Sequence, residues 1–149
     1  MLKTSLIHPD ILAALGRAGH SSRVLISDGN FPHATMRGPR AELVNLNVAP
    51  GCVSLTDVLE PLLTAIPVEK ASVMAPLREG PYAMEGDPEI FGDFEKLLGR
   101  AGFSDPLERL ERFDFYDAAK ADDVCLTIAT GEQRIYANLL LTIGVVQPG

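Results

Sequence analysis

Short apolar runs alternate with amphipathic helical segments along this chain, and this alternation constrains the fold more than any other feature. Pro9 and Asp10 suit the first turn of a helix over residues 9–17, because proline fits that position and an acidic side chain favours the helix N-terminus. Arg23–Ser27 is a short, mostly apolar run typical of a buried strand. Strands that alternate with helices predict an α/β fold in which helices cover a central sheet.

The remaining predicted elements follow the same alternation. Ser54 begins a helix and forms a capping pair with Asp57, whereas Pro61 is expected to kink or divide that helix. The other predicted helices are Pro88–Arg100, capped by Asp87, and Phe113–Ala121. The other predicted strands are Glu42–Asn47, Lys70–Ala75, Val124–Ala129 and Ile135–Val146, while Leu107–Arg112 is left open between strand and loop.

The last two predicted strands are separated by the turn-like residues Thr130, Gly131 and Glu132. Strands this close along the chain are expected to form an antiparallel hairpin, which makes the sheet mixed. The sequence therefore predicts a three-layer α/β sandwich with a mixed central sheet covered by helices, built as a single domain over residues 1–149.

Composition narrows the possible partners. The 149 residues include 20 acidic and 13 basic side chains, a net charge of −7, and this balance argues against nucleic acid or an anionic membrane as partner. Cys52 and Cys125 form no CxxC pair and are expected to be buried thiols in a reducing compartment. No apolar run has the length of a signal peptide core or a membrane span, so a cytoplasmic location is expected.

Several common chemistries lack their signatures. The three histidines are scattered without HxxxH spacing, so no metal site is expected. The chain contains no GxGxxG or GxxxxGK[ST] phosphate loop and no GxSxG nucleophile elbow. Both cysteines have apolar surroundings in which a thiol is inert.

Polar side chains at the ends of predicted elements are the candidate functional residues, because open α/β sheets bind ligands there. They are His20, Asp28, Arg112, Tyr116, Tyr136 and Asn138. Five of them have an ordinary structural alternative: a helix cap for His20, a turn for Asp28, a solvated charge for Arg112, and core edges with hydrated hydroxyls for the two tyrosines.

Six short segments, taken in their order along the chain, favour the functional interpretation of these residues over the structural one. They are Met1–Lys3, Gly19-His20, Ser27–Pro32, Glu111–Tyr116, Ala129–Glu132, and Tyr136–Leu139 through Gly144-Val145. In this order and spacing the chain resembles the D-ribose pyranase / L-fucose mutarotase family, nearly end to end. Arg112–Tyr116 makes the fucose mutarotase branch the closer one, because the pyranase branch carries histidine at the position of Tyr116.

The resemblance implies a cofactor-free enzyme that interconverts the anomers or ring forms of a reducing monosaccharide. His20 resembles the family's proton-transfer residue, and Asp28 resembles its sugar-binding carboxylate. Arg112 and Tyr116 fall in a stretch that supplies further sugar contacts. The segment Tyr136, Ala137 and Asn138 matches the family's C-terminal sugar-binding segment.

These residue types suit mutarotation. Ring opening removes a proton from the anomeric hydroxyl and delivers one to the ring oxygen, and histidine does this near neutral pH. Asp28 and Asn138 would bind the fixed hydroxyls, and either Tyr116 or Tyr136 would stack on the sugar or carry the second proton. Asn45 and Asn47 replace charged residues of the mutarotase branch, so the sugar is left open between fucose-like and ribose-like.

Two alternatives to an enzymatic function remain open, and the family resemblance also implies an assembly of subunits. The chain could bind a monosaccharide without catalysis, or it could be a scaffolding subunit. Family members assemble as rings, commonly decamers, with the site near a subunit boundary, so a homo-oligomer is expected. The aliphatic segment Ile135–Val146 is either a core strand or part of such an interface.

Overall fold

The computed structural model describes residues 1–149 as one six-stranded sheet with four helices. The helices are α1 (Pro9–Arg17), α2 (Leu55–Leu62), α3 (Glu89–Arg100) and α4 (Arg112–Ala119). The strands are β1 (Arg23–Ser27), β2 (Glu42–Asn45), β3 (Val68–Met74), β4 (Glu108–Leu110), β5 (Val124–Ala129) and β6 (Leu139–Ile143). Their order in the sheet is β2-β5-β1-β6-β3-β4, and β6 alone runs antiparallel to its neighbours.

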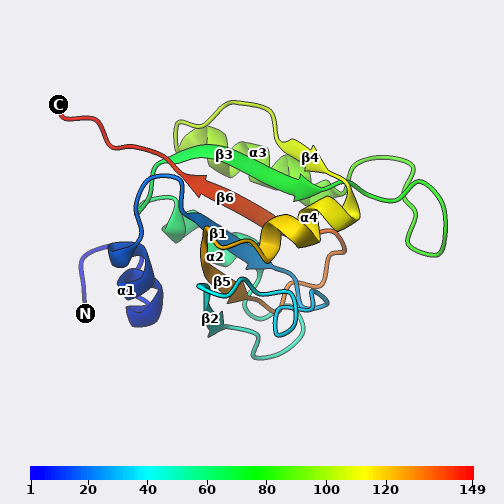
Figure 1. Ribbon diagram of the computed structural model, residues 1–149, viewed down its shortest axis with the longest axis horizontal. Helices are drawn as coiled ribbons and strands as arrows, with labels where there is room; N and C mark the ends of the chain where they lie inside the picture. The colour runs from blue at the N-terminus through cyan, green and yellow to red at the C-terminus, as the bar shows by residue number, and fades with distance from the viewer.

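Helices cover both faces of this sheet, as the predicted three-layer sandwich requires. Apolar side chains of α1, α2 and α3 pack with one face of the central strands into a large core. Phe115 and Ala119 of α4 pack with Phe31 and Leu140 into a smaller core on the other face. Figure 1 shows α4 in front of the sheet and α2 and α3 behind it. The mixed α/β sandwich predicted from the sequence is therefore confirmed.

The helix that begins after Ser54 forms as its capping pair predicts. The Ser54 hydroxyl accepts a hydrogen bond from the Asp57 N–H, and the Asp57 carboxylate accepts one from the Ser54 N–H. Pro61 does not divide this helix, because it lies in the last turn and α2 ends one residue later at Leu62.

The predicted hairpin of the last two strands is wrong. β5 pairs in parallel with β1 and β2, whereas β6 pairs with β1 and β3, so β1 separates the two strands. The intervening residues 130–138 cross the carboxyl end of β1, where the Thr130 N–H and hydroxyl both donate to the Ser27 carbonyl. Because of this crossing, β6 lies on the side of β1 opposite to β5. The sheet is mixed because β6 runs antiparallel to both of its neighbours.

Other boundaries and one burial prediction also change. The strand predicted over Ile135–Val146 is limited to Leu139–Ile143, because Tyr136 has a positive φ of 59° that extended pairing does not allow. The open segment near residue 110 contains the short strand β4. Pro88, not Asp87, is the N-cap of α3. Cys52 is exposed and Cys125 partly buried, so the prediction of two buried thiols is wrong.

Candidate active site

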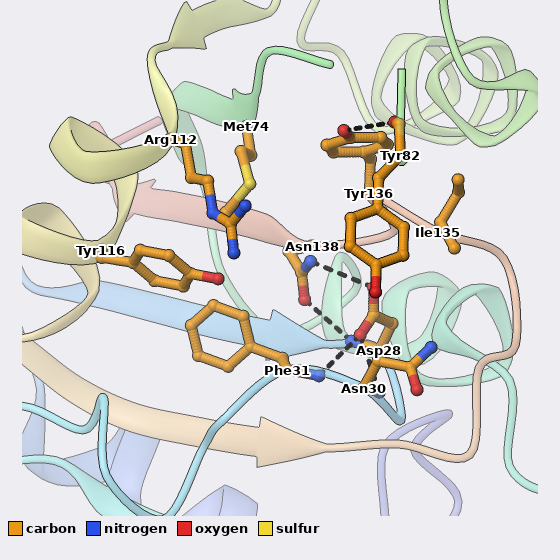
Figure 2. Close-up of a pocket in the computed structure, with 10 residues that line it drawn as sticks. All are labelled: Asp28, Asn30, Phe31, Met74, Tyr82, Arg112, Tyr116, Ile135, Tyr136 and Asn138. Carbon is orange, nitrogen blue, oxygen red and sulfur yellow. Dashed lines mark hydrogen bonds between the residues drawn. The ribbon is translucent and has the colours of Figure 1, made fainter. Parts of the chain in front are cut away.

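The polar candidate residues meet at the carboxyl edge of the sheet. Because β6 runs antiparallel to β1, its amino end lies beside the carboxyl end of β1, which brings Asn138 next to Asp28. The pocket at this edge, here called the edge pocket, has a volume of about 350 Å³. It is lined by Asp28, Asn30, Phe31, Met74, Tyr82, Arg112, Tyr116, Ile135, Tyr136 and Asn138 (Figure 2).

A buried pair forms the floor of the edge pocket. The Asp28 N–H donates to Asn138 Oδ1 at 2.9 Å, and Asn138 Nδ2 donates to Asp28 Oδ2 at 3.1 Å. Asp28 Oδ1 accepts from the N–H groups of Asn30 and Phe31 at 2.9 and 2.8 Å. Asp28 is 3% exposed and Asn138 is 4% exposed. These contacts fix both side chains and leave unused acceptor capacity on Asp28 Oδ2 for a ligand hydroxyl.

Burial changes the acidity of this carboxyl group. Desolvation raises the pKa of Asp28 to about 6, because the charged form is disfavoured away from water. The hydrogen bonds from Asn30, Phe31, Asn138 and the backbone of Ala137 favour the carboxylate and offset part of this effect. Asp28 therefore changes its charge close to neutral pH.

One wall of the edge pocket comes from α4. Tyr116 packs against Phe31 with ring centroids 5.7 Å apart, and the Arg112 guanidinium lies 5.7 Å from the Tyr116 ring centroid. Residues four apart share a helix face, so α4 presents Arg112 and Tyr116 together. Figure 2 shows the Tyr116 hydroxyl and the Arg112 guanidinium directed into the pocket, and neither makes a hydrogen bond within the chain. Both groups are available to a ligand.

Tyr136 has a structural task besides lining the pocket. Its hydroxyl accepts a hydrogen bond from the Leu77 N–H at 3.1 Å and donates one to the Tyr82 carbonyl at 2.8 Å. These bonds hold the loop after β3 over the pocket, and that loop carries the Tyr82 side chain, which is exposed and lines the pocket rim. The Tyr136 ring faces the pocket while its hydroxyl is occupied by the loop.

His20 lies apart from these residues. It precedes β1, whereas Asp28 follows it, and five residues of strand span about 16 Å. His20 Nε2 lies 2.9 Å from Glu69 Oε2, and its side chain is 53% exposed. The structure thus brings Asp28, Arg112, Tyr116, Tyr136 and Asn138 together in the edge pocket and leaves His20 at the opposite edge of the sheet. Ala137 is fully buried and contributes only backbone.

The segment after β5 forms a rigid support beside the pocket. The buried Glu132 carboxylate accepts hydrogen bonds from the Leu55 N–H, the Arg134 N–H and the Arg134 guanidinium. Burial acts to raise the pKa of Glu132, but the bonds from Arg134 and Leu55 outweigh it and hold the pKa below its usual range. Glu132 therefore ties the α2 N-terminus to this segment and is not free to bind a ligand.

Sequence reasoning missed half of the pocket lining. The missed residues are Asn30, Phe31, Met74, Tyr82 and Ile135. Asn30 and Phe31 could have been predicted from the sequence, because they follow Asp28 directly at a strand end. Tyr82 carries no such signal, since it lies eight residues beyond β3 in a loop without a motif.

No group of three or more His, Cys, Asp or Glu side chains is placed to hold a metal ion. No helix has both the length and the apolar character needed to span a membrane. The fold and the edge pocket define an α/β protein with a pocket suited to a small polar molecule at the carboxyl edge of a mixed sheet.

Comparison with known proteins identifies the family. The model of the RbsD / FucU transport protein family matches residues 1–146, and the chain belongs to this family. Human fucose mutarotase is 29% identical over 146 residues, covering 95% of this chain and 91% of that protein. The family resemblance stated from the sequence motifs is therefore confirmed.

Solved structures agree with this assignment. The fucose mutarotase of Streptococcus pneumoniae in complex with L-fucose superimposes with a TM-score of 0.79 at 25% identity, covering 99% of this chain and all of that one. Bacillus subtilis RbsD complexed with D-ribose has a TM-score of 0.76 over 99% of this chain and all of that one, and at 23% identity it supports the fold.

Proposed function

We propose that this chain is an isomerase, a mutarotase or pyranase that interconverts the anomers or ring forms of a fucose-like or ribose-like reducing monosaccharide. The observation that carries the proposal is the buried Asp28–Asn138 pair in a pocket of about 350 Å³ that also holds the free Arg112 and Tyr116 groups. A monosaccharide presents several hydroxyls around a partly apolar ring, and this pocket offers acceptors, donors and aromatic walls. Membership of a family that includes fucose mutarotase relatives supports the reaction type.

The proposed reaction needs two proton transfers and no cofactor. A base takes the proton of the anomeric hydroxyl while an acid protonates the ring oxygen, so the bond between C1 and the ring oxygen breaks and an aldehyde forms. Rotation about the C1–C2 bond and the reverse transfers close the ring as the other anomer. Asp28, Asn138 and the Ala137 backbone hold the fixed hydroxyls, and Arg112 binds a sugar oxygen.

Of the two tyrosines, Tyr116 is the better proton carrier. Its hydroxyl points into the pocket without a protein partner, whereas the Tyr136 hydroxyl is hydrogen-bonded to the loop after β3. We assign Tyr136 chiefly to the pocket wall, where its ring contacts the apolar face of the sugar.

His20 can serve this pocket only from a second copy of the chain, because β1 separates it from its own Asp28. The amino edge of one sheet must then face the carboxyl edge of the next. Such a head-to-tail contact is heterologous and forms a ring when the rotation between copies closes. We propose a ring-type homo-oligomer of this kind, decameric as in the family. Exposed Tyr82, Phe113 and Ile135 near the pocket supply apolar surface for this contact.

Two coarser features complete the proposal. Residues 1–149 form the sugar mutarotase-like domain, and the macromolecular partners we propose for it are the other copies of the ring. Cys52 and Cys125 form no disulfide, which supports a cytoplasmic, reducing location.

Saturation-transfer NMR on L-fucose, D-ribose and other monosaccharides tests the activity directly. We expect the wild-type protein to accelerate anomer exchange of at least one sugar, and His20→Ala to abolish the acceleration. Binding without acceleration would establish the non-catalytic binding protein instead. Neither binding nor acceleration with any sugar would leave only the scaffolding role.

A further inference from the structure

A second, polar groove adjoins the edge pocket and is not used by the proposed reaction. Three amide side chains, Asn30, Asn47 and Gln133, line it together with the backbone of residues 49–50 and 130–132, and we call it the amide groove. Its volume of about 390 Å³ is close to that of the edge pocket, and Asn30 lines both. Figure 2 shows the Asn30 side chain at the lower rim of the edge pocket, directed away from Tyr116.

The groove has rigid walls. The Gly51 N–H donates to the Gly131 carbonyl at 2.6 Å, and the Gly131 N–H donates to the Val53 carbonyl at 2.8 Å. A Cβ atom on Gly131 would lie 2.4 Å from the Ala49 carbonyl oxygen, so the two segments touch backbone to backbone. Glu132 adds the hydrogen bonds that tie this region to α2. The backbone that frames the groove is therefore held in place without a ligand.

The free groups in the groove are neutral. The side-chain amides of Asn30, Asn47 and Gln133 make no hydrogen bond within the chain. The lining has no Lys, Arg or His, and the Glu132 carboxylate is 5% exposed and fully hydrogen-bonded. A phosphate or other anion would find no cation here, and an apolar group would find almost no apolar wall. Amides that both donate and accept suit a neutral, hydroxyl-rich ligand.

We propose that the amide groove is a second sugar subsite, so that the protein also binds reducing disaccharides, with the reducing unit in the edge pocket and the neutral second unit against Asn47 and Gln133. This inference rests on the proposed function, because it takes the edge pocket to hold a reducing sugar. Asn30 stands at the junction of the two units. The second unit adds hydrogen bonds to the free amides while the anomeric centre keeps the contacts described above.

The test compares a monosaccharide with disaccharides that end in the same reducing unit. The probes are L-fucose and its (1→3)- and (1→4)-linked α-L-fucosyl-L-fucose disaccharides, with binding measured by calorimetry and anomer exchange by NMR. We expect at least one disaccharide to bind about tenfold more tightly than L-fucose. Asn47→Ala and Gln133→Ala should each weaken disaccharide binding about fivefold, as for loss of one neutral hydrogen bond, and leave L-fucose binding and exchange unchanged.

A matched control separates the groove from the general effect of losing an exposed amide. Gln147→Ala removes an exposed amide outside the groove and should change the binding of neither sugar. Disaccharides that bind no more tightly than L-fucose, or groove variants that alter both sugars alike, would overturn the subsite. Failure of the proposed function gives a different result. The protein would then not accelerate the anomer exchange of L-fucose, even if a disaccharide bound and Asn47→Ala weakened that binding.

Discussion

Asp28 is a buried, hydrogen-bonded carboxyl group whose pKa the fold raises. Its pKa rises from 3.8 to about 6 in the fold, so between these pH values the folded state binds a proton that the unfolded state has lost. Stability from this group is complete below about pH 4 and is lost as pH rises through 6. One pKa unit corresponds to about 1.4 kcal/mol, so ionised Asp28 costs the folded state about 3 kcal/mol at pH 7.

Asp28→Asn should therefore remove one component of the pH dependence of stability. We expect the free energy of unfolding of the variant, relative to wild type, to increase by up to about 3 kcal/mol between pH 4 and pH 7. Urea denaturation of both proteins across this range measures the difference and cancels the other titrating groups. A difference that stays constant with pH would show that Asp28 is not perturbed.

A substitution of Tyr116 is expected to change the activity without changing the stability of the protein. Its hydroxyl has no partner in the chain, whereas its ring packs on Phe31, so Tyr116→Phe keeps the packing and removes one proton carrier. We expect anomer exchange to fall about 100-fold while the free energy of unfolding stays within about 0.5 kcal/mol of wild type. NMR exchange rates beside urea denaturation check both. Undiminished exchange would exclude Tyr116 as the second proton carrier.

The Tyr136 hydroxyl anchors the loop after β3 through two hydrogen bonds. Tyr136→Phe removes the acceptor of the Leu77 N–H and the donor to the Tyr82 carbonyl. We expect the Leu77 amide to exchange with solvent hydrogen at least tenfold faster, with a loss of about 1 kcal/mol in stability. Hydrogen exchange followed by NMR gives the measurement. Tyr82→Phe is the control, since the Tyr82 hydroxyl makes no hydrogen bond in the chain, and equal effects of both variants would contradict the anchor.

Two glycines test how tightly the segments beside the edge pocket are packed. A Cβ on Gly131 would meet the Ala49 and Cys52 carbonyl oxygens at 2.4 and 2.5 Å, whereas a Cβ on Gly92 of α3 meets nothing within 4 Å. We expect Gly131→Ala to destabilise the protein by about 3 kcal/mol and Gly92→Ala to stabilise it by up to about 1 kcal/mol. Thermal and urea unfolding distinguish the two. Destabilisation of similar size in both variants would contradict the close contact at Gly131.

Elements were predictable where local chemistry decides them. The Ser54–Asp57 capping box, the proline at the start of α1 and the apolar run of β1 each act within a few residues, and all three elements form as predicted. The partner of β6 was not predictable, because it depends on where residues 130–138 cross β1. That crossing rests on contacts such as Thr130 to Ser27, which are about a hundred residues apart in the chain.

The candidate site shows the same limit. Asp28 and Asn138 were identified from their places at strand ends and from the family motifs, yet their mutual hydrogen bonds require β6 to run antiparallel beside β1. Tyr82 was missed because its position over the pocket is set by the Tyr136 hydroxyl, a contact 54 residues away in sequence. His20 was identified by motif, but its separation from Asp28 follows only from the direction of β1.

At the scale of the whole molecule, the two edges of the sheet carry complementary parts of one proposed site. In Figure 1 the carboxyl ends of β1 and β3 point to one side of the molecule, and the chain termini lie on the other. A single copy therefore holds Asp28 without His20 at one edge and His20 without Asp28 at the other.

Mixing two inactive variants tests this arrangement. In a ring, each site takes Asp28 from one copy and His20 from the next, so equal amounts of His20→Ala and Asp28→Asn chains, unfolded and refolded together, assemble at random. About one quarter of the sites then combine an intact Asp28 with an intact His20, and we expect about 25% of wild-type anomer exchange from two proteins that are each inactive alone. The same variants refolded separately and then mixed without subunit exchange should stay inactive. If His20 and Asp28 served one site within a single chain, no combination of the two variants would restore an intact site, and the co-refolded mixture would be as inactive as its components.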